Sequence, residues 1–259
     1  MARINRQFIN FIKLSLLLVL VLVLVGVGSS AWAKTLLIYK GAYGNNYGSV
    51  YYDGEYSGIS VEGWSEKLDD AFGSSNITVT TDSSLDAYTT DNITDFDAIL
   101  VEIGDLNGGA DDALSVSDKA KLNAFIATGK RVVLTGENNS WSTWNTSITS
   151  LTAMDSATTV SSGDDSYDVL TTDASTITYA AAGSASGTNG TALFGNRVSV
   201  IWGDSSNVLT VLDTNFNDDT YISNNDNRQY STNIANWLFN APTISSTTVA
   251  ADNSTIDVT

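Results

Sequence analysis

Two glutamates, in or directly after apolar runs of the sequence, are candidate catalytic carboxylates. Glu137 follows the apolar run that opens residues 132–145, VVLTGENNSWSTWN, and two tryptophans come soon after it. Glu102 stands in a second apolar run, residues 97–103. The carboxyl ends of neighbouring parallel strands meet at one edge of a sheet, so we expect the two glutamates to face each other. Paired carboxylates beside tryptophans are typical of a sugar site, and they predict a carbohydrate-active hydrolase that uses Glu102 and Glu137.

The same edge could instead bind a ligand without reacting with it. An early loop, residues 41–58, is rich in tyrosine, glycine and asparagine, a mixture typical of adaptable recognition surfaces. A glycan or another cell-surface ligand is the expected partner. A plainer interpretation stays open, in which Glu137 caps the following helix and the tryptophans belong to the core. The predicted ligand-binding residues are Tyr43, Asn45, Asp105, Glu137, Asn138 and Trp141.

Two residue types are missing, and their absence excludes several chemistries. The sequence holds neither cysteine nor histidine. Thiol nucleophiles, zinc sites built on cysteine or histidine, and serine–histidine–aspartate triads are therefore excluded. The 29 acidic and 12 basic residues give a net charge of −17, which repels the phosphate backbone of nucleic acids. Nucleic acid is therefore not an expected partner.

One acidic loop has the alternating oxygen ligands that a hard cation prefers. Asp213, Asn215 and Asn217 occupy alternate positions in the sequence DTNFNDD. They match the first half of an EF-hand loop, but Asp218 stands where that loop has glycine, and Asn224 stands where it has glutamate. The sequence offers Ca²⁺ as a candidate ion, with a solvated turn as the alternative. It indicates no other cofactor.

Residues 1–33 have the three parts of a secretory signal peptide. Basic residues precede an apolar run at 14–27, and the end, Ala31-Trp32-Ala33, matches a small-x-small cleavage site. The run is shorter than the ~20 residues that span a bilayer. We therefore expect export to the periplasm, the cell surface or the medium. An uncleaved membrane anchor is the alternative, and no other contact with a membrane is expected.

The elements that must position these side chains alternate along the chain. Apolar residues at helical spacing predict helices at 59–72, 115–128, 144–154 and 229–240. Several short strands are expected within 156–186. Because the strands are apolar without alternation, they are expected to be covered on both faces, which predicts a three-layer α/β fold around a mostly parallel sheet. The main strands are predicted at 35–40, 76–81, 97–103, 130–135, 198–202 and 208–212, the last two as an antiparallel pair.

Three stretches resemble a known fold. DFDAILVEIGD with LSVSDKAKLNAFIATGKRVVLTGEN is similar to the central strand–helix–strand of glutamine-amidotransferase-like, flavodoxin-like domains. NNDNRQYSTNIANWLF resembles their closing helix, and TLLIYKGAYG fits their first strand and loop, so the resemblance covers about residues 35–240. It implies a cysteine at the elbow after the relevant strand and a histidine later. The elbow here, residues 135–140, has no cysteine, so the resemblance implies a non-catalytic member.

The last residues differ in sequence pattern from the rest of the chain. Residues 241–259, APTISSTTVAADNSTIDVT, resemble the opening of a bacterial Ig-like repeat, and such a domain needs roughly 70 further residues. We therefore expect a fragment of a longer multidomain protein, with a signal peptide at 1–33, an α/β domain at 34–240 and the start of an Ig-like domain at 241–259.

The function expected from the sequence is an exported, non-catalytic binding or scaffolding module of a cell-surface or secreted protein. Two alternatives stay open. One is the hydrolase that uses Glu102 and Glu137, and the other is a purely structural spacer domain of an adhesin-like protein.

Overall fold

The fold is known from a computed structural model, in which the chain divides into two units, residues 1–33 and 34–259. Everything below concerns the second unit. The predicted signal peptide as far as Trp32, Tyr43, Asn45, Asp105 and the C-terminal tail lie outside the described residues. The structure describes residues 33–39, 55–56, 59–60, 67–68, 71–73, 76–82, 84–103, 113–166, 173–203, 207–217 and 221–239.

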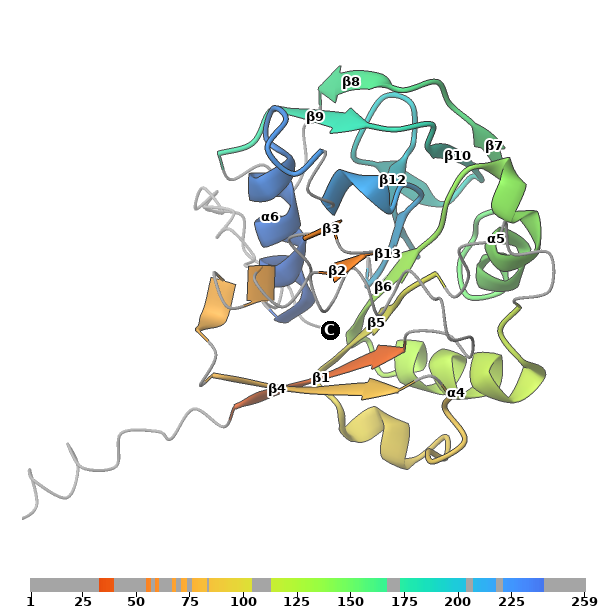
Figure 1. Cartoon of the computed structure of the whole chain (residues 1–259). Coiled ribbons are helices and arrows are strands. Elements are labelled where there is room, and N and C mark those ends of the chain that lie inside the picture. Colours follow the sequence, from red (N-terminus) through yellow and green to blue (C-terminus); the bar gives the residue numbers. More distant parts are fainter. Residues whose placement is uncertain are drawn as a thin grey trace, which may run out of the picture. The chain divides into compact units, whose positions relative to one another are not determined.

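A seven-stranded, mostly parallel sheet forms the centre of the described part of this unit (Figure 1). The parallel strands lie in the order β4-β1-β5-β6-β13, which is the order 2-1-3-4-5 of flavodoxin-like folds when they are counted along the chain. The antiparallel strands β12 and β11 follow at one edge. The predicted α/β fold class and the antiparallel pairing of β12 with β13 are confirmed. The strands are β1 (Lys34–Tyr39), β4 (Ile77–Asp82), β5 (Ala98–Val101), β6 (Arg131–Thr135), β11 (Gly190–Ala192), β12 (Ser199–Trp202) and β13 (Val208–Val211).

Helices cover both faces of the sheet, which makes three layers (Figure 1). α6 (Asn227–Phe239) packs on one face, where Leu36 and Leu100 belong to the same core cluster as its Ile234. α4 (Val116–Ala127), α5 (Ser142–Thr149) and the short η1 (Asn92–Asp95) pack on the other face, where Leu37 and Val101 join Phe125 of α4. Successive residues of a strand point to opposite faces, so a strand buried on both faces is apolar throughout.

The ends of α4 follow the predicted signals. The Ser115 hydroxyl oxygen accepts a hydrogen bond from the Asp118 amide at 3.0 Å, as expected of a residue that caps a helix. Gly129, which follows the last turn, has a φ of +78°, a backbone conformation that glycine adopts without strain.

Two helix predictions are wrong in part. The helix predicted at 59–72 does not begin at its first residues, because Ile59–Ser60 is the strand β3 and pairs with β2 (Glu55–Tyr56). The helix predicted at 144–154 begins earlier, directly after the 3-10 turn η2 (Asn139–Trp141), and it ends at Thr149. Leu151 and Met154 are buried at helical spacing, but they lie beyond the helix.

Hydroxyl groups explain the early end of α5. Thr149, Ser150 and Thr152 each donate a side-chain hydrogen bond to the carbonyl oxygen three residues earlier, at 2.8, 2.9 and 3.3 Å. Such bonds offer the backbone an alternative to the helical pattern. A run of serine and threonine therefore stops the helix while the apolar spacing continues.

Small antiparallel ribbons fill the chain between α5 and β12, as predicted for residues 156–186. β7 (Ser156–Thr159) pairs with β10 (Gly183–Ser186), and β8 (Gly163–Ser166) pairs with β9 (Thr176–Tyr179). The connection between β9 and β10 lies at the end of β13. There the Ala180 amide donates to Asp213 Oδ2 at 3.0 Å, and the Gly183 amide donates to the Leu212 carbonyl at 2.6 Å.

Long side chains close the opposite, amino-terminal edge of the sheet. Lys130 Nζ donates to the carbonyl oxygens of Thr94 and Phe96 at 2.7 and 2.8 Å. The Arg131 guanidinium donates to the carbonyl oxygen of Trp237 in the last turn of α6 and lies 4.8 Å from the centre of its ring. Within the described residues, no helix is long and apolar enough to cross a membrane.

Candidate functional site

Three carboxyl groups belong to residues just beyond the carboxyl ends of neighbouring strands. The register of β6 and β13 pairs Thr135 with Val211, so Glu137 and Asp213 lie equally far beyond the paired residues. Glu102 follows β5 on the other side of β6. The exposed fractions of Glu102, Glu137 and Asp213 are 1%, 3% and 0%. We call the ends of β6 and β13, with Glu137 and Asp213, the corner.

Glu137 uses both carboxylate oxygens to join the two strand ends. Oε1 accepts from the Asn138 backbone and side-chain amides at 2.9 and 3.3 Å. Oε2 accepts from the Thr214 amide at 3.3 Å and from its hydroxyl at 3.0 Å. The Glu137 backbone is held by α5, because its amide donates to Asn145 Oδ1 and its carbonyl oxygen accepts from Asn145 Nδ2. Hydrogen bonds therefore hold both the side chain and the backbone of Glu137 in place.

Burial changes the acidity of this group. It raises the pKa of Glu137 to about 7, against the opposing effect of the hydrogen bonds from Asn138 and Thr214. Near neutral pH the carboxyl group is then present in both its protonated and its charged forms. Such a group suits general acid or base catalysis, provided that a substrate can reach it.

Glu102 is hydrogen-bonded to the last residue of the neighbouring strand β6. Its Oε2 atom accepts from the Thr135 hydroxyl at 3.0 Å. The same hydroxyl oxygen accepts from the Ile103 amide at 2.8 Å, so the ends of β5 and β6 are joined at this point. Glu102 and Glu137 thus come from neighbouring strands, and both are buried.

Gly183, the first residue of β10, packs directly against the corner. A Cβ atom on Gly183 would lie 2.5 Å from the carbonyl oxygen of Glu137 and 2.9 Å from Leu212 Cβ. Only a residue without a side chain allows this approach. A substrate could reach Glu137 from this direction only if the start of β10 moved away.

Of the three predicted metal ligands, Asp213 accepts hydrogen bonds from backbone amides of the protein. Asp213 Oδ1 accepts from the Asn215 amide and Oδ2 from the Ala180 amide, both at 3.0 Å. Asn215–Asn217 form the 3-10 turn η3, in which successive residues are ~120° apart, so Asn215 and Asn217 do not share a face. Asn217 is 1% exposed, and among the described residues neither polar atom of its side-chain amide has a hydrogen-bond partner. In the part of the chain that is described, no three acidic side chains gather closely enough to hold a metal ion.

The other described residues of the predicted ligand site lie in the elbow or directly after it. Asn138, and not Glu137, caps the next turn, because its Oδ1 atom accepts from the Ser140 amide at 2.9 Å. Trp141 is half-buried and packs against the core cluster on the α4 and α5 face. Trp144 is buried, and its indole N–H donates to the Thr135 carbonyl at 2.8 Å.

Sequence reasoning missed several residues of the corner. Thr214 could have been found, because it follows the strand predicted at 208–212 just as Glu137 follows its own strand. Asn145 and Gly183 carry no local signal. Their contacts with Glu137 arise only when α5 and β10 pack against the strand ends.

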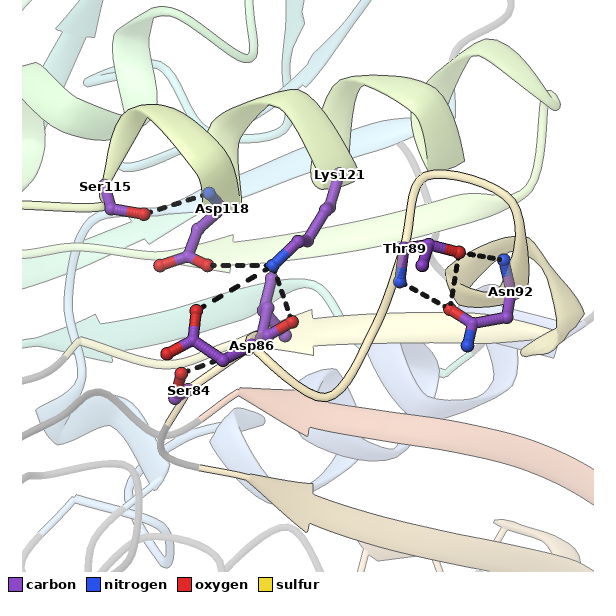
Figure 2. Close-up of polar contacts among 8 residues, drawn as sticks. Ser84, Asp86, Thr89, Asn92, Ser115, Asp118 and Lys121 are labelled. Carbon is purple, nitrogen blue, oxygen red and sulfur yellow. Dashed lines mark hydrogen bonds and ion pairs between the residues drawn. The ribbon is translucent and has the colours of Figure 1, made fainter.

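A second polar cluster lies between α4 and the segment after β4 (Figure 2). Lys121 is 8% exposed and donates to the Leu85 carbonyl at 2.7 Å. Its Nζ lies 3.9 Å from Asp118 Oδ1 and 4.0 Å from Asp86 Oδ1. The Asp118 side chain is as buried as that of the lysine, whereas the Asp86 side chain is exposed. The ammonium group therefore fastens this segment to α4.

A hollow of about 320 Å³ lies between α4 and α5. Its lining combines hydroxyl groups with one ammonium group, which are donors suited to a hydroxylated or anionic ligand. The lining residues are Ala113, Lys119, Ser142, Thr143, Thr146 and Ser147.

The chain is similar in fold to solved structures. It matches the mmIFT52 N-terminal domain with a TM-score of 0.56 at 10% identity, covering 81% of this chain and 99% of that domain. The exo-beta-1,4-mannosidase Op5Man5 from Opitutaceae bacterium strain TAV5 gives a TM-score of 0.45 at 10% identity, over 79% of this chain and 35% of that enzyme. A ThuA-like protein from Bacteroides uniformis ATCC 8492 gives 0.47 at 11% identity, over 80% of this chain and 91% of that protein. No family model and no curated protein matches the chain.

Proposed function

We propose that residues 34–240 are a binding or scaffolding module of an exported protein, and that the module breaks no bonds of its own. The observation that supports this proposal is the hydrogen bonding of Glu137 in the elbow, residues 135–140. Glu137 stands there with both carboxylate oxygens engaged by donors of the protein itself. A reactive carboxyl group needs at least one oxygen that a substrate can reach.

The neighbours of Glu137 support the same interpretation. Both carboxylate oxygens of Asp213 accept hydrogen bonds from backbone amides. Gly183 lies against the Glu137 carbonyl group. The chain has no cysteine or histidine that could act in their place. In this proposal the polar residues of the corner hold three segments of chain together, and the rigid fold presents its outer surfaces to a partner.

The proposed partner is a glycan or another hydroxyl-rich cell-surface ligand. The hollow between α4 and α5 supports this choice, because Lys119 and the Thr146 hydroxyl group are among its lining groups. Export, which brings the module into contact with such ligands, rests on the signal-like residues 1–33.

A glycan array probed with the mature chain, residues 34–259, tests the binding proposal. We expect binding to at least one glycan, and we expect the paired change Lys119→Met and Thr146→Ala to weaken it. Asn123→Ala, an exposed change elsewhere on α4, is the matched control. Calorimetry with Ca²⁺ tests the loop at Asp213. If neither assay detects binding, the binding proposal is contradicted and a spacer domain is favoured.

The hydrolase is the second candidate, and the acidity of Glu137 favours it. A carboxyl group with a pKa of about 7 can act as an acid at neutral pH, with Glu102 as the partner carboxylate. Turnover of a panel of aryl glycosides by the wild type and by Glu137→Gln decides between the two. Turnover that the variant abolishes would establish the hydrolase, and absent or unchanged turnover would exclude Glu137 as its acid.

A further inference from the structure

We propose that the hollow between α4 and α5 binds an anionic sugar, in which the ammonium group of Lys119 pairs with the charged group of the ligand and hydroxyl groups of α5 bond to the hydroxyl groups of its ring. The inference rests on the proposed function and deepens it, since it names the class of glycan. The charged group of such a sugar is a carboxylate or a sulfate ester, and both present oxygen acceptors to the same donors.

The α5 side of the hollow presents hydroxyl groups that the helix itself does not use. Ser142 and Thr146 are exposed and four residues apart, so they lie one above the other on the same face of α5. Within the part of the chain that is described, neither hydroxyl group has a hydrogen-bond partner. Ser147 differs, because its hydroxyl group donates to the Trp144 carbonyl oxygen at 2.8 Å. Ser142 and Thr146 therefore remain available to a ligand as donors and acceptors.

Lys119 supplies the positive charge. Of the described residues that line the hollow, it alone is charged, and its ammonium group makes no ion pair or hydrogen bond with any of the described side chains. Asp118, the acid next to it in the sequence, lies 3.9 Å from Lys121 Nζ instead, so that cation offsets its charge (Figure 2). Lys130 differs from Lys119, since it donates to the carbonyl oxygens of two other residues. An anion in the hollow would give Lys119 the partner that the protein does not supply.

An apolar side chain lies beside this ammonium group. Val116 is 83% exposed and stands three residues before Lys119 on α4, so the two are neighbours on the helix surface. A sugar ring has a face of C–H groups, and covering Val116 with that face removes apolar surface from water. An inorganic anion has no such face. The combination therefore favours a charged sugar over a free sulfate or phosphate ion.

The size and surroundings of the hollow suit a short charged glycan. Its volume of about 320 Å³ stands at the lower end of the ~300–1,000 Å³ of small-molecule sites, which fits the end of a glycan. The net charge of −17 opposes anions in general, but at physiological ionic strength exposed charges more than about 8 Å apart are largely screened. The contact with Lys119 then outweighs the distant acids.

NMR titrations of the mature chain, residues 34–259, with three matched sugars test the inference. The probes are methyl glucuronide, which carries a carboxylate, methyl glucoside 6-sulfate, and the neutral methyl glucoside. We expect at least one charged probe to shift the amide signals of Lys119, Ser142 and Thr146, with a Kd at least about fivefold lower than that of the neutral probe. The charged probe that binds more tightly identifies the acid group.

Variants separate the charge from the hydroxyl groups. Lys119→Met should remove the preference for charged sugars, and Lys119→Arg should keep it. Arg228→Met is the matched control, because it removes the same charge from an exposed position on α6, which packs on the other face of the sheet. It should leave the preference unchanged. The paired change Ser142→Ala and Thr146→Ala should weaken the binding of all three sugars by similar factors.

The outcomes distinguish this inference from the proposed function. Equal affinity for charged and neutral sugars, or an equal loss of preference in Lys119→Met and Arg228→Met, would overturn the inference and leave a glycan-binding module. If no probe shifts the signals of the hollow, the inference is also wrong. The glycan array then decides the proposed function separately, since a bound glycan would preserve it and an array without binding would remove both.

Discussion

Thr214 donates two hydrogen bonds to a single carboxylate oxygen of Glu137, although 77 residues separate them along the chain. The contact joins the end of β13 to the end of β6. At the end of β6, Thr135 donates one hydrogen bond, from its hydroxyl group, to Glu102, which follows β5. The carboxyl edge is therefore held by pairs of threonine and glutamate between neighbouring strands, and each pair removes a carboxylate from solvent.

The raised pKa of Glu137 predicts how stability depends on pH. The folded state holds the proton up to about pH 7, whereas the unfolded chain releases it near the ordinary glutamate pKa of 4.5. The folded state then binds more protons between these values, so this contribution to stability is complete below about pH 4.5 and is lost as the pH rises through about 7. Relative to Glu137→Gln, the wild type should lose up to about 3 kcal/mol across this range.

Urea titrations at several pH values measure this effect. The quantity of interest is the difference in unfolding free energy between the wild type and Glu137→Gln, since the other carboxyl groups are shared and cancel. Asp226→Asn is the control, because its lowered pKa gives a pH dependence of the opposite sign and at lower pH. Parallel stability profiles for the wild type and Glu137→Gln would contradict the prediction.

Gly183→Ala tests whether the close packing of the first residue of β10 against the corner matters for stability. The new Cβ would lie 2.5 Å from a backbone oxygen of Glu137, which cannot turn away as a flexible side chain can. We expect a loss of about 1–3 kcal/mol in unfolding free energy. Gly163→Ala is the matched control, since its nearest neighbour, the Tyr179 hydroxyl oxygen, is 3.5 Å away. Equal effects of the two changes would show that the close approach is not what matters.

Much of the fold could be predicted from the sequence, because burial of the central strands leaves a local pattern of apolar residues. Strands such as β5 and β6 are buried on both faces, so they are continuous apolar runs that local reading detects. The ends of α4 were equally clear, because Ser115 and Gly129 are local signals. The end of α5 was misjudged, since the hydroxyl bonds of Thr149 and its neighbours compete with the apolar spacing.

The candidate site was harder to predict, because its contacts are not local. The strand-end rule placed Glu102 and Glu137 on neighbouring strands. It gave no sign that Gly183 would lie against Glu137, since that contact depends on how a separate ribbon packs. The burial of Glu137, and hence its raised pKa, follows from the same packing.

A large loss of stability is predicted on replacing Asn227, whose uncharged side-chain amide is buried. Its Oδ1 atom accepts from the Thr178 amide at 2.8 Å, and its Nδ2 atom donates to the carbonyl oxygens of Thr178, Phe216 and Tyr221. Asn227→Ala leaves these buried backbone groups without a partner, and we expect a loss of about 2–4 kcal/mol. Asn123→Ala, exposed on α4, should change stability by less than about 0.5 kcal/mol. Thermal unfolding followed by circular dichroism measures both, and similar melting temperatures for the two variants would refute the role of Asn227.

Lys121 supports a last prediction, at the cluster that fastens the segment after β4 to α4 (Figure 2). Lys121→Met keeps most of the apolar stem but removes the donor to the Leu85 carbonyl and leaves the buried Asp118 without its cation. We expect a loss of about 2–4 kcal/mol in urea unfolding, most of it from Asp118, because the pair with the exposed Asp86 contributes little. The double change Lys121→Met with Asp118→Asn should therefore recover part of the loss. Lys119→Met, two residues away and less buried, is the control and should change stability by less than about 0.5 kcal/mol. If the double variant were as unstable as the sum of the two single variants, the ammonium group would not be acting on Asp118.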